Sequence, residues 1–270
     1  MSNLSYTFDS FDDQLKSREI ERLTSNVDSH SKVMTEIFLN NGLHEAKKVL
    51  DVGCGTGAMI DMFAKLMPNT TFVGLDNSHH ILAKAEENVL PNTSFTRGEA
   101  ALLPFEDNSF DFVYTRLVLM HNHIPERIIR EMKRVCKPGG MIICVEVDDE
   151  TMIFHPYSSE FSDLMRANVA YAAQNGCDRI IGRKLFSLYK AANIQQVKVI
   201  TQTSDYEGPY NDIPFPLQLA IGSDQAMHLV EAGLITEAQR IDILQKIKLF
   251  CSDPNRFYSG SFMYSIGKKE

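Results

Sequence analysis

Three glycines alternate with other residues directly after an apolar run, in the segment VLDVGCGTG at residues 49–57. Gly53 and Gly55 would let the backbone approach a ligand closely, and Gly57 would let a helix begin tight against the preceding strand. Asp51 lies just before this turn. The spacing differs from the G-x-G-x-x-G of dinucleotide-binding turns, and no P-loop lysine follows. The segment is therefore a candidate ligand-binding turn between a strand and a helix.

A second acid ends the next apolar run, FVGLDNS at residues 72–78. Asp76 lies 19 residues after Gly57, where a neighbouring strand would present its carboxylate to the hydroxyls of a ribose. A carboxylate only accepts hydrogen bonds, so it can bind both hydroxyl hydrogens. Together the two segments predict a nucleoside site at the carboxyl ends of adjacent strands.

These segments belong to a regular alternation of β-rich runs and helical patterns, which predicts an α/β fold with a parallel sheet and crossover helices. Expected strands cover 49–52, 71–75, 94–97, 110–114, 141–147, 197–200 and, as a final edge strand, 262–266. Expected helices cover 57–66, 78–88, 125–136, 159–174 and 179–193. Two further helices are predicted between residues 10 and 41, and a helical insert between 206 and 255 with a capping box at 236–239.

The expected parts of the chain are N-terminal helices at 1–44, a core at 45–150 and two helical inserts, within 151–204 and 205–256, before a final strand in 257–270. Open α/β sheets bind ligands at the carboxyl ends of their strands. The N-terminal helices and the inserts are therefore expected to lie over that edge and to form the roof of a pocket.

Composition favours a soluble globular protein, because 44% of the 270 residues are hydrophobic. A formal net charge of -8 disfavours nucleic acid as a partner. Five cysteines without a CxxC pair, a polar N-terminus and the absence of a long apolar run predict a cytoplasmic protein with no membrane contact. No metal is expected, because the pairs His79-His80 and His121-x-His123 lack a third ligand at a familiar spacing.

Four segments in order resemble the class I S-adenosylmethionine-dependent methyltransferases, most closely the ubiquinone/menaquinone-type small-molecule branch. They are 49–57, 72–78, the segment GEAALLPFEDNSFDFVYTR at 98–116, and REMKRVCKPGGMIICVEVD at 130–148, where Cys136 replaces the usual leucine. The resemblance implies a Rossmann-like, seven-stranded, mostly parallel sheet with helices on both faces, N-terminal helices and helical lids. It also implies S-adenosylmethionine as cofactor, with S-adenosylhomocysteine as the product.

The resemblance assigns cofactor-binding roles to several residues. Asp51 is expected near the methionine moiety, Asp76 at the ribose, and Glu99, where the family more often has Asp, near adenine with the next backbone amide. Arg116 is expected at the methionine carboxylate or a substrate anion, or in a surface ion pair, and Arg22 at the carboxylate or in solvent. The full expected set is Asp51, Gly53, Cys54, Gly55, Gly57, Asp76, Asn77, Glu99, Ala100, Thr115, Arg116 and Arg22.

Methyl transfer is an in-line displacement that needs alignment and desolvation more than a catalytic constellation. His121, after the fourth core strand, is the candidate general base, although a histidine there also often only packs. The candidate acceptor-binding residues, each of which could instead serve packing or form a solvated pair, are Tyr6, Phe8, Phe11, His121, His155, Tyr157, Asp163 and Arg166.

Three functions remain open on the sequence. The favoured one is methyl transfer to O or N of a small molecule or short peptide, by a monomer or homodimer. An RNA or large-protein methyltransferase would call for a basic face or a flat open site, which the acid excess and the lid-like helices oppose. A noncatalytic protein of the same fold, binding this cofactor or NAD, is the third.

Overall fold

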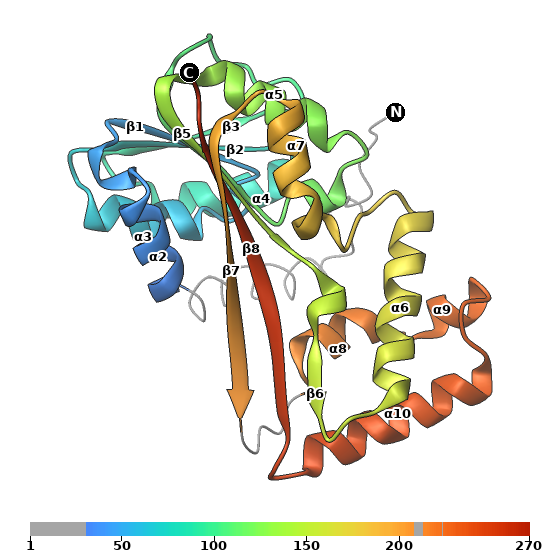
Figure 1. Cartoon of the computed structure of the whole chain (residues 1–270). Helices are drawn as coiled ribbons and strands as arrows, with labels where there is room; N and C mark the ends of the chain where they lie inside the picture. The colour runs from blue at the N-terminus through green and yellow to red at the C-terminus, as the bar shows by residue number, and fades with distance from the viewer. Residues whose placement is uncertain (1–30, 208–212, 223) are drawn as a thin grey trace. The chain divides into compact units, whose positions relative to one another are not determined.

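The computed structural model describes residues 31–207, 213–222 and 224–270 (Figure 1). The predicted helix before residue 31 and the site candidates Tyr6, Phe8, Phe11 and Arg22 lie outside these ranges. The chain divides into two compact units. The first unit comprises Met1–Val145, Lys184–Ile200 and Tyr264–Glu270, and the second comprises Glu146–Arg183 and Thr201–Met263.

Within the described residues, eight strands form one sheet in the order β3-β2-β1-β4-β5-β8-β6, with β7 paired to β8. The five strands β1–β5 are joined by parallel ladders, and β6 runs antiparallel to β8. This arrangement confirms the predicted Rossmann-like sheet and adds one short strand to the expected seven. The strands are β1 (Lys48–Val52), β2 (Thr71–Asp76), β3 (Thr93–Arg97), β4 (Phe110–Arg116), β5 (Cys136–Val147), β6 (Ile153–His155), β7 (Gln195–Glu207) and β8 (Phe257–Lys268).

The last strand differs from its prediction. It was expected at an edge, but β8 pairs with β5, β6 and β7 and therefore lies inside the sheet. It is also longer than expected, and the chain after it continues the pairing: Lys269 donates to the Gly140 carbonyl, and Gly139 donates to the Lys269 carbonyl. The proline-glycine segment at 138–140, which follows the predicted helix at 125–136, is thus part of β5.

Helices cover both faces of the sheet in the first unit. Figure 1 shows α2 (Ser31–Asn40), α3 (Ala58–Leu66) and α4 (His79–Ala85) on one side of β1–β5, and α5 (Pro125–Val135) and α7 (Leu185–Ala191) on the other. An aromatic cluster joins the first group to the sheet. The Phe38 ring of α2 lies 5.5 Å from Phe63 of α3, 5.7 Å from Phe112 and 5.2 Å from Tyr114 of β4.

The second unit has its own apolar core, formed by α6 (Ser159–Gln174), α8 (Phe215–Ile221), α9 (Met227–Glu231) and α10 (Glu237–Ser252). The predicted capping box before α10 is confirmed: Thr236 accepts from the Gln239 amide, and the Gln239 side chain accepts from the Thr236 amide. The buried core of this unit includes Phe161, Leu164, Leu217, Leu229, Ile243, Ile247 and Phe250.

Within the described ranges, no helix has the length and apolar character that crossing a membrane would require.

Candidate functional site

The carboxyl ends of three adjacent strands bring the two acids of the sequence motifs together. Asp51 of β1 pairs in register with Gly74 of β2 on one side and Tyr114 of β4 on the other. Asp76 is the last residue of β2. The parallel ladders therefore place both carboxylates at the same edge of the sheet, as predicted.

The glycine turn between β1 and α3 is held against the end of β2. The backbone amides of Gly53 and Cys54 both donate to the Leu75 carbonyl, at 2.7 and 3.0 Å. Gly53 has φ +76°, and a Cβ added to it would overlap the Val118 side chain. Gly55 has φ +54°, but a Cβ there would meet no atom within 4 Å. Gly53 is thus required by the protein's own packing, whereas Gly55 borders open space that a ligand could occupy.

Asp76 is fixed by the backbone on both of its carboxylate oxygens. Oδ2 accepts from the Gly55 amide at 3.0 Å, and Oδ1 accepts from the Ser78 amide at 3.0 Å. These bonds join the glycine turn to the end of β2 and set the direction in which the carboxylate faces. Because an ionised carboxylate can accept about four hydrogen bonds, two backbone bonds are compatible with further hydroxyl donors.

Asp51 is buried and has one clear side-chain partner. It is 2% exposed, and the Tyr114 hydroxyl donates to its Oδ2 at 2.8 Å. The pKa of Asp51 is raised to about 7, mainly by burial. The Tyr114 hydrogen bond and the charge of Arg116 lower this pKa, and the charge of Asp76 raises it. Burial and the Asp51 charge hold the pKa of Tyr114 well above its usual value. The carboxyl group therefore titrates near neutral pH inside the site.

Sequence reasoning missed Tyr114, because nothing in the segment FDFVYTR distinguishes a ligand-site tyrosine from a core aromatic. Its role follows only from the register that pairs it with Asp51. The neighbouring Thr115 is fully buried, and its hydroxyl donates to the Val52 carbonyl at 2.7 Å, so its side chain joins β4 to β1. Any cofactor contact of Thr115 would therefore fall to its backbone.

The other predicted residues of the first unit follow the strand ends. Arg116 ends β4 and is partly exposed, and His121 ends a short 3₁₀ helix, Leu119–His121. Glu99, which is exposed, and Ala100 follow β3. Cys54 is buried in the glycine turn, and its burial raises the pKa of the thiol well above the usual value. Asn77 follows Asp76, and its carbonyl accepts from Arg97 Nε at 3.0 Å.

Four predicted acceptor residues belong to the second unit. His155 and Tyr157 are exposed, and Asp163 forms an exposed ion pair with Arg166 on α6. The ion pair matches the solvated alternative that the sequence allowed for these two residues. Among the described residues, no group of three His, Cys, Asp or Glu side chains is placed to hold a metal ion.

Comparisons with known proteins place these observations in a family. The family described as "Methyltransferase domain" matches residues 43–210. An uncharacterized methyltransferase of Schizosaccharomyces pombe is 36% identical over 148 residues, covering 51% of this chain and 53% of that protein. The demethylmenaquinone methyltransferase of Staphylococcus aureus is 33% identical over 143 residues, covering 50% of this chain and 58% of that protein. The chain thus spans little more than half the length of these relatives.

Solved structures share the fold at lower sequence identity. The YcgJ protein of Bacillus subtilis has a TM-score of 0.57 and 20% identity, covering 89% of this chain and all of that one. The plantazolicin methyltransferase BpumL, solved in complex with SAH, has a TM-score of 0.56 and 15% identity, covering 98% of this chain and 94% of that one. At these identities the likeness concerns the fold alone.

Proposed function

Because the chain belongs to the class I S-adenosylmethionine-dependent methyltransferases, whose cofactor is S-adenosylmethionine, we propose that it transfers the cofactor's methyl group to O or N of a small molecule or short peptide. S-adenosylhomocysteine would be the second product. The main support is the edge where β1, β2 and β4 end, because it combines a backbone-oriented acid, a buried acid and an open glycine turn. Family membership confirms the resemblance and the cofactor predicted from the motifs.

The residues at this edge fit the parts of the cofactor. Asp76, held by the Gly55 and Ser78 amides, is the proposed acceptor for the ribose hydroxyls. Gly55 borders open space, so the backbone of the turn can approach the ligand closely. We assign Glu99 and Ala100 to the adenine. Asp51, Arg116 and the buried Tyr114 that bonds Asp51 are assigned to the charged methionine end.

The cofactor supplies a methyl group on a sulfonium centre whose departure leaves a neutral thioether. The protein therefore has to align the acceptor and exclude water, which can contribute roughly 7 to 11 kcal/mol in favourable cases. His121 is the proposed general base for a hydroxyl acceptor, because it lies in the segment that follows β4. An amine acceptor would need only to arrive neutral.

A small-molecule acceptor has two supports. The net charge of -8 opposes a nucleic-acid substrate, and one of the relatives is a demethylmenaquinone methyltransferase. His155, Tyr157, Asp163 and Arg166 remain acceptor candidates on the sequence argument. A cytoplasmic location and a monomeric or homodimeric state likewise remain predictions.

Calorimetric titration with S-adenosylmethionine and with NAD tests the site first. We expect micromolar-range binding of S-adenosylmethionine only, and loss of that binding in Asp76→Ala. The matched control is Asp61→Ala, which removes a partly exposed acid of α3 that pairs with Lys65 at 2.6 Å. Thermal melting of each variant separates loss of the ligand from loss of the fold. Unchanged binding in Asp76→Ala would count against the proposed site.

A screen of phenols, catechols, amines and short peptides with labelled cofactor tests the reaction itself. Label transfer to a small acceptor supports the proposed activity. Transfer only to RNA or to large proteins would contradict the proposed acceptor class. Cofactor binding without transfer to any class of acceptor would point to a noncatalytic protein of the same fold.

A further inference from the structure

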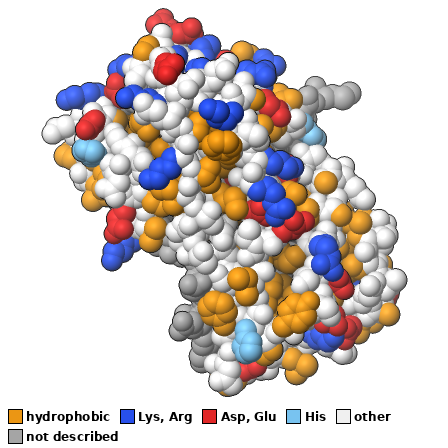
Figure 2. Space-filling model, in the orientation of Figure 1, with side chains coloured by type: hydrophobic (Ala, Val, Ile, Leu, Met, Phe, Trp, Pro, Cys, Tyr) orange, Lys and Arg blue, Asp and Glu red, His pale blue; other side chains and the backbone are white. Residues whose placement is uncertain are grey.

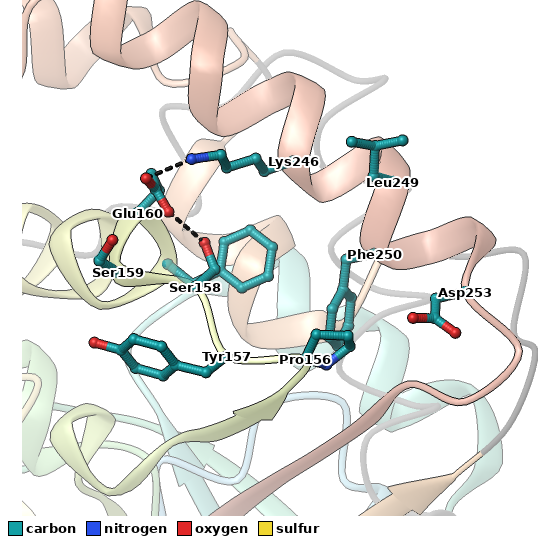
Figure 3. Close-up of a pocket in the computed structure, with 10 residues that line it drawn as sticks. Pro156, Tyr157, Ser158, Ser159, Glu160, Lys246, Leu249, Phe250 and Asp253 are labelled. Carbon is teal, nitrogen blue, oxygen red and sulfur yellow. Dashed lines mark hydrogen bonds and ion pairs between the residues drawn. The ribbon is translucent and has the colours of Figure 1, made fainter.

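The second unit contains a hollow of about 340 Å³ between the start of α6 and the last turns of α10. We call it the α10 hollow. In Figure 3, Pro156 and Tyr157 lie on the segment before α6, the Phe250 ring points from α10 toward Pro156, and Lys246 extends from α10 toward Glu160. All of its lining residues belong to the second unit: Pro156, Tyr157, Ser158, Ser159, Glu160, Phe161, Lys246, Leu249, Phe250 and Asp253.

One part of the hollow is aromatic and apolar. The Phe161 and Phe250 rings meet edge to face, with their centroids 5.3 Å apart, and both are nearly buried. Tyr157 and Leu249 are instead 77% and 68% exposed. Figure 2 shows hydrophobic side chains gathered on the visible face of this unit. The hollow therefore exposes apolar surface to solvent.

The charges around this apolar surface are mainly negative. Glu160 is paired with Lys246, accepts from Ser158 Oγ at 2.8 Å, and has its pKa lowered to about 2 by the Lys246 bond. Lys246 also contacts Asp242, with 3.1 Å between Nζ and Oδ2, so one ammonium group serves two carboxylates. A third carboxylate, Asp253, accepts from the Asn255 amide at 2.8 Å and forms no ion pair with any residue that the structure describes.

Asp253 also occupies the electrostatically unfavourable end of a helix. It is the C-cap of α10, a helix of 16 residues with no basic residue in its last turn. The carbonyl end of a helix carries partial negative charge, which a carboxylate reinforces and a cation would neutralise. Arg256 lies with its guanidinium carbon 5.7 Å from the Phe250 ring centroid, but it is buried and does not line the hollow. A negative potential thus borders the aromatic surface.

We propose that the α10 hollow binds an organic ammonium ion, in which a protonated amine is joined to an aromatic or branched aliphatic group. The apolar group contacts Tyr157, Phe161, Leu249 and Phe250, because hydrophobic and aromatic linings bury the apolar part of a ligand. The ammonium group lies toward Asp253 and the carbonyl end of α10. All of these contacts belong to the second unit, and Tyr157 is the one lining residue that is also an acceptor candidate.

The test uses the full chain without cofactor and three probes that share one apolar group: 2-phenylethylammonium, 2-phenylethanol and phenylacetate. Saturation-transfer NMR titrations give the dissociation constants. We expect the ammonium ion to bind at least about fivefold more tightly than the alcohol, and phenylacetate to bind more weakly still. Competition between the ammonium ion and the alcohol is expected, since both would occupy the same apolar surface.

Two variants separate the two parts of the site. Asp253→Asn keeps a side-chain oxygen that can accept from the Asn255 amide, so the local structure should persist. The variant should bind the ammonium ion about three- to fivefold more weakly and should bind the alcohol with unchanged affinity. Tyr157→Ala removes an exposed ring and should weaken both probes. Glu231→Gln, which neutralises an exposed acid at the end of α9 outside the hollow, is the matched control and should change neither. Equal affinity for alcohol and ammonium ion, or an unchanged preference in Asp253→Asn, would overturn the proposal.

Discussion

The substitution Tyr114→Phe isolates one hydrogen bond in the candidate cofactor site. It removes the hydroxyl that donates to Asp51 Oδ2 at 2.8 Å and keeps the ring that packs against Phe38 and Phe63. Both partners are buried, so water does not replace the lost donor easily. The variant should therefore change the titration of Asp51 more than the packing of the core.

The size of the effect follows from the two states of the acceptor. A hydrogen bond to an ionised group contributes about 1.5–3 kcal/mol, and one to a neutral group about 0.5–1.5 kcal/mol. Losing the bond should thus disfavour the ionised form by about 1.4 kcal/mol relative to the protonated form. That difference raises the pKa of Asp51 by about one further unit above its wild-type value of about 7.

The sign of the pH dependence follows from proton binding. The pKa of Asp51 is raised from 3.8 to about 7 by burial, so between these values the folded protein holds a proton that the unfolded chain has lost. The stability from this proton is present below the unfolded pKa and is lost as the pH rises through the folded pKa. In Tyr114→Phe this loss of stability continues to higher pH. The deficit in the variant's free energy of unfolding, relative to the wild type, should therefore grow by about 1.4 kcal/mol between pH 6 and pH 9.

Urea unfolding of both proteins at pH 6 and pH 9 measures this deficit. The matched control is Thr70→Val, because the Thr70 hydroxyl is also buried but donates to the Ala46 backbone carbonyl, which does not titrate, at 2.8 Å. Its deficit should be the same at both pH values. An equal deficit at both pH values in Tyr114→Phe would refute the assigned bond between the phenol and an ionising Asp51.

Three further outcomes are expected. Gly53→Ala should destabilise the first unit in urea unfolding and abolish cofactor binding, because the positive φ of Gly53 and the Val118 side chain exclude a Cβ. Gly55→Ala should melt close to wild type, because only its positive φ opposes a side chain, and should lose affinity for the cofactor. Thr236→Ala should cost about 1 kcal/mol in urea unfolding through loss of the capping box, more than Ser158→Ala, whose side chain makes no capping bond to α6. His121→Ala should keep calorimetric cofactor affinity and lower turnover, and full turnover would remove His121 as the base.

The sequence was informative where local chemistry dictates local structure. The glycine turn, the acid that ends β2 and the start of α5 at residue 125 each depend on neighbouring residues, and all three lie where the sequence predicted. The capping box before α10 was readable for the same reason. In contrast, β8 was predicted at an edge, because its length and its pairing on both sides depend on strands far away in the chain.

By itself, the sequence determined the family, the cofactor and the order of the core elements, because these follow from residue types at short, fixed spacings. Only the tertiary structure decided that Tyr114 bonds Asp51, that both oxygens of Asp76 are held by backbone amides, and that Asp163 pairs with Arg166 in solvent. The first of these joins residues 63 positions apart through the register of two strands. Burial, and with it the raised pKa of Asp51, exists only once the strands are assembled.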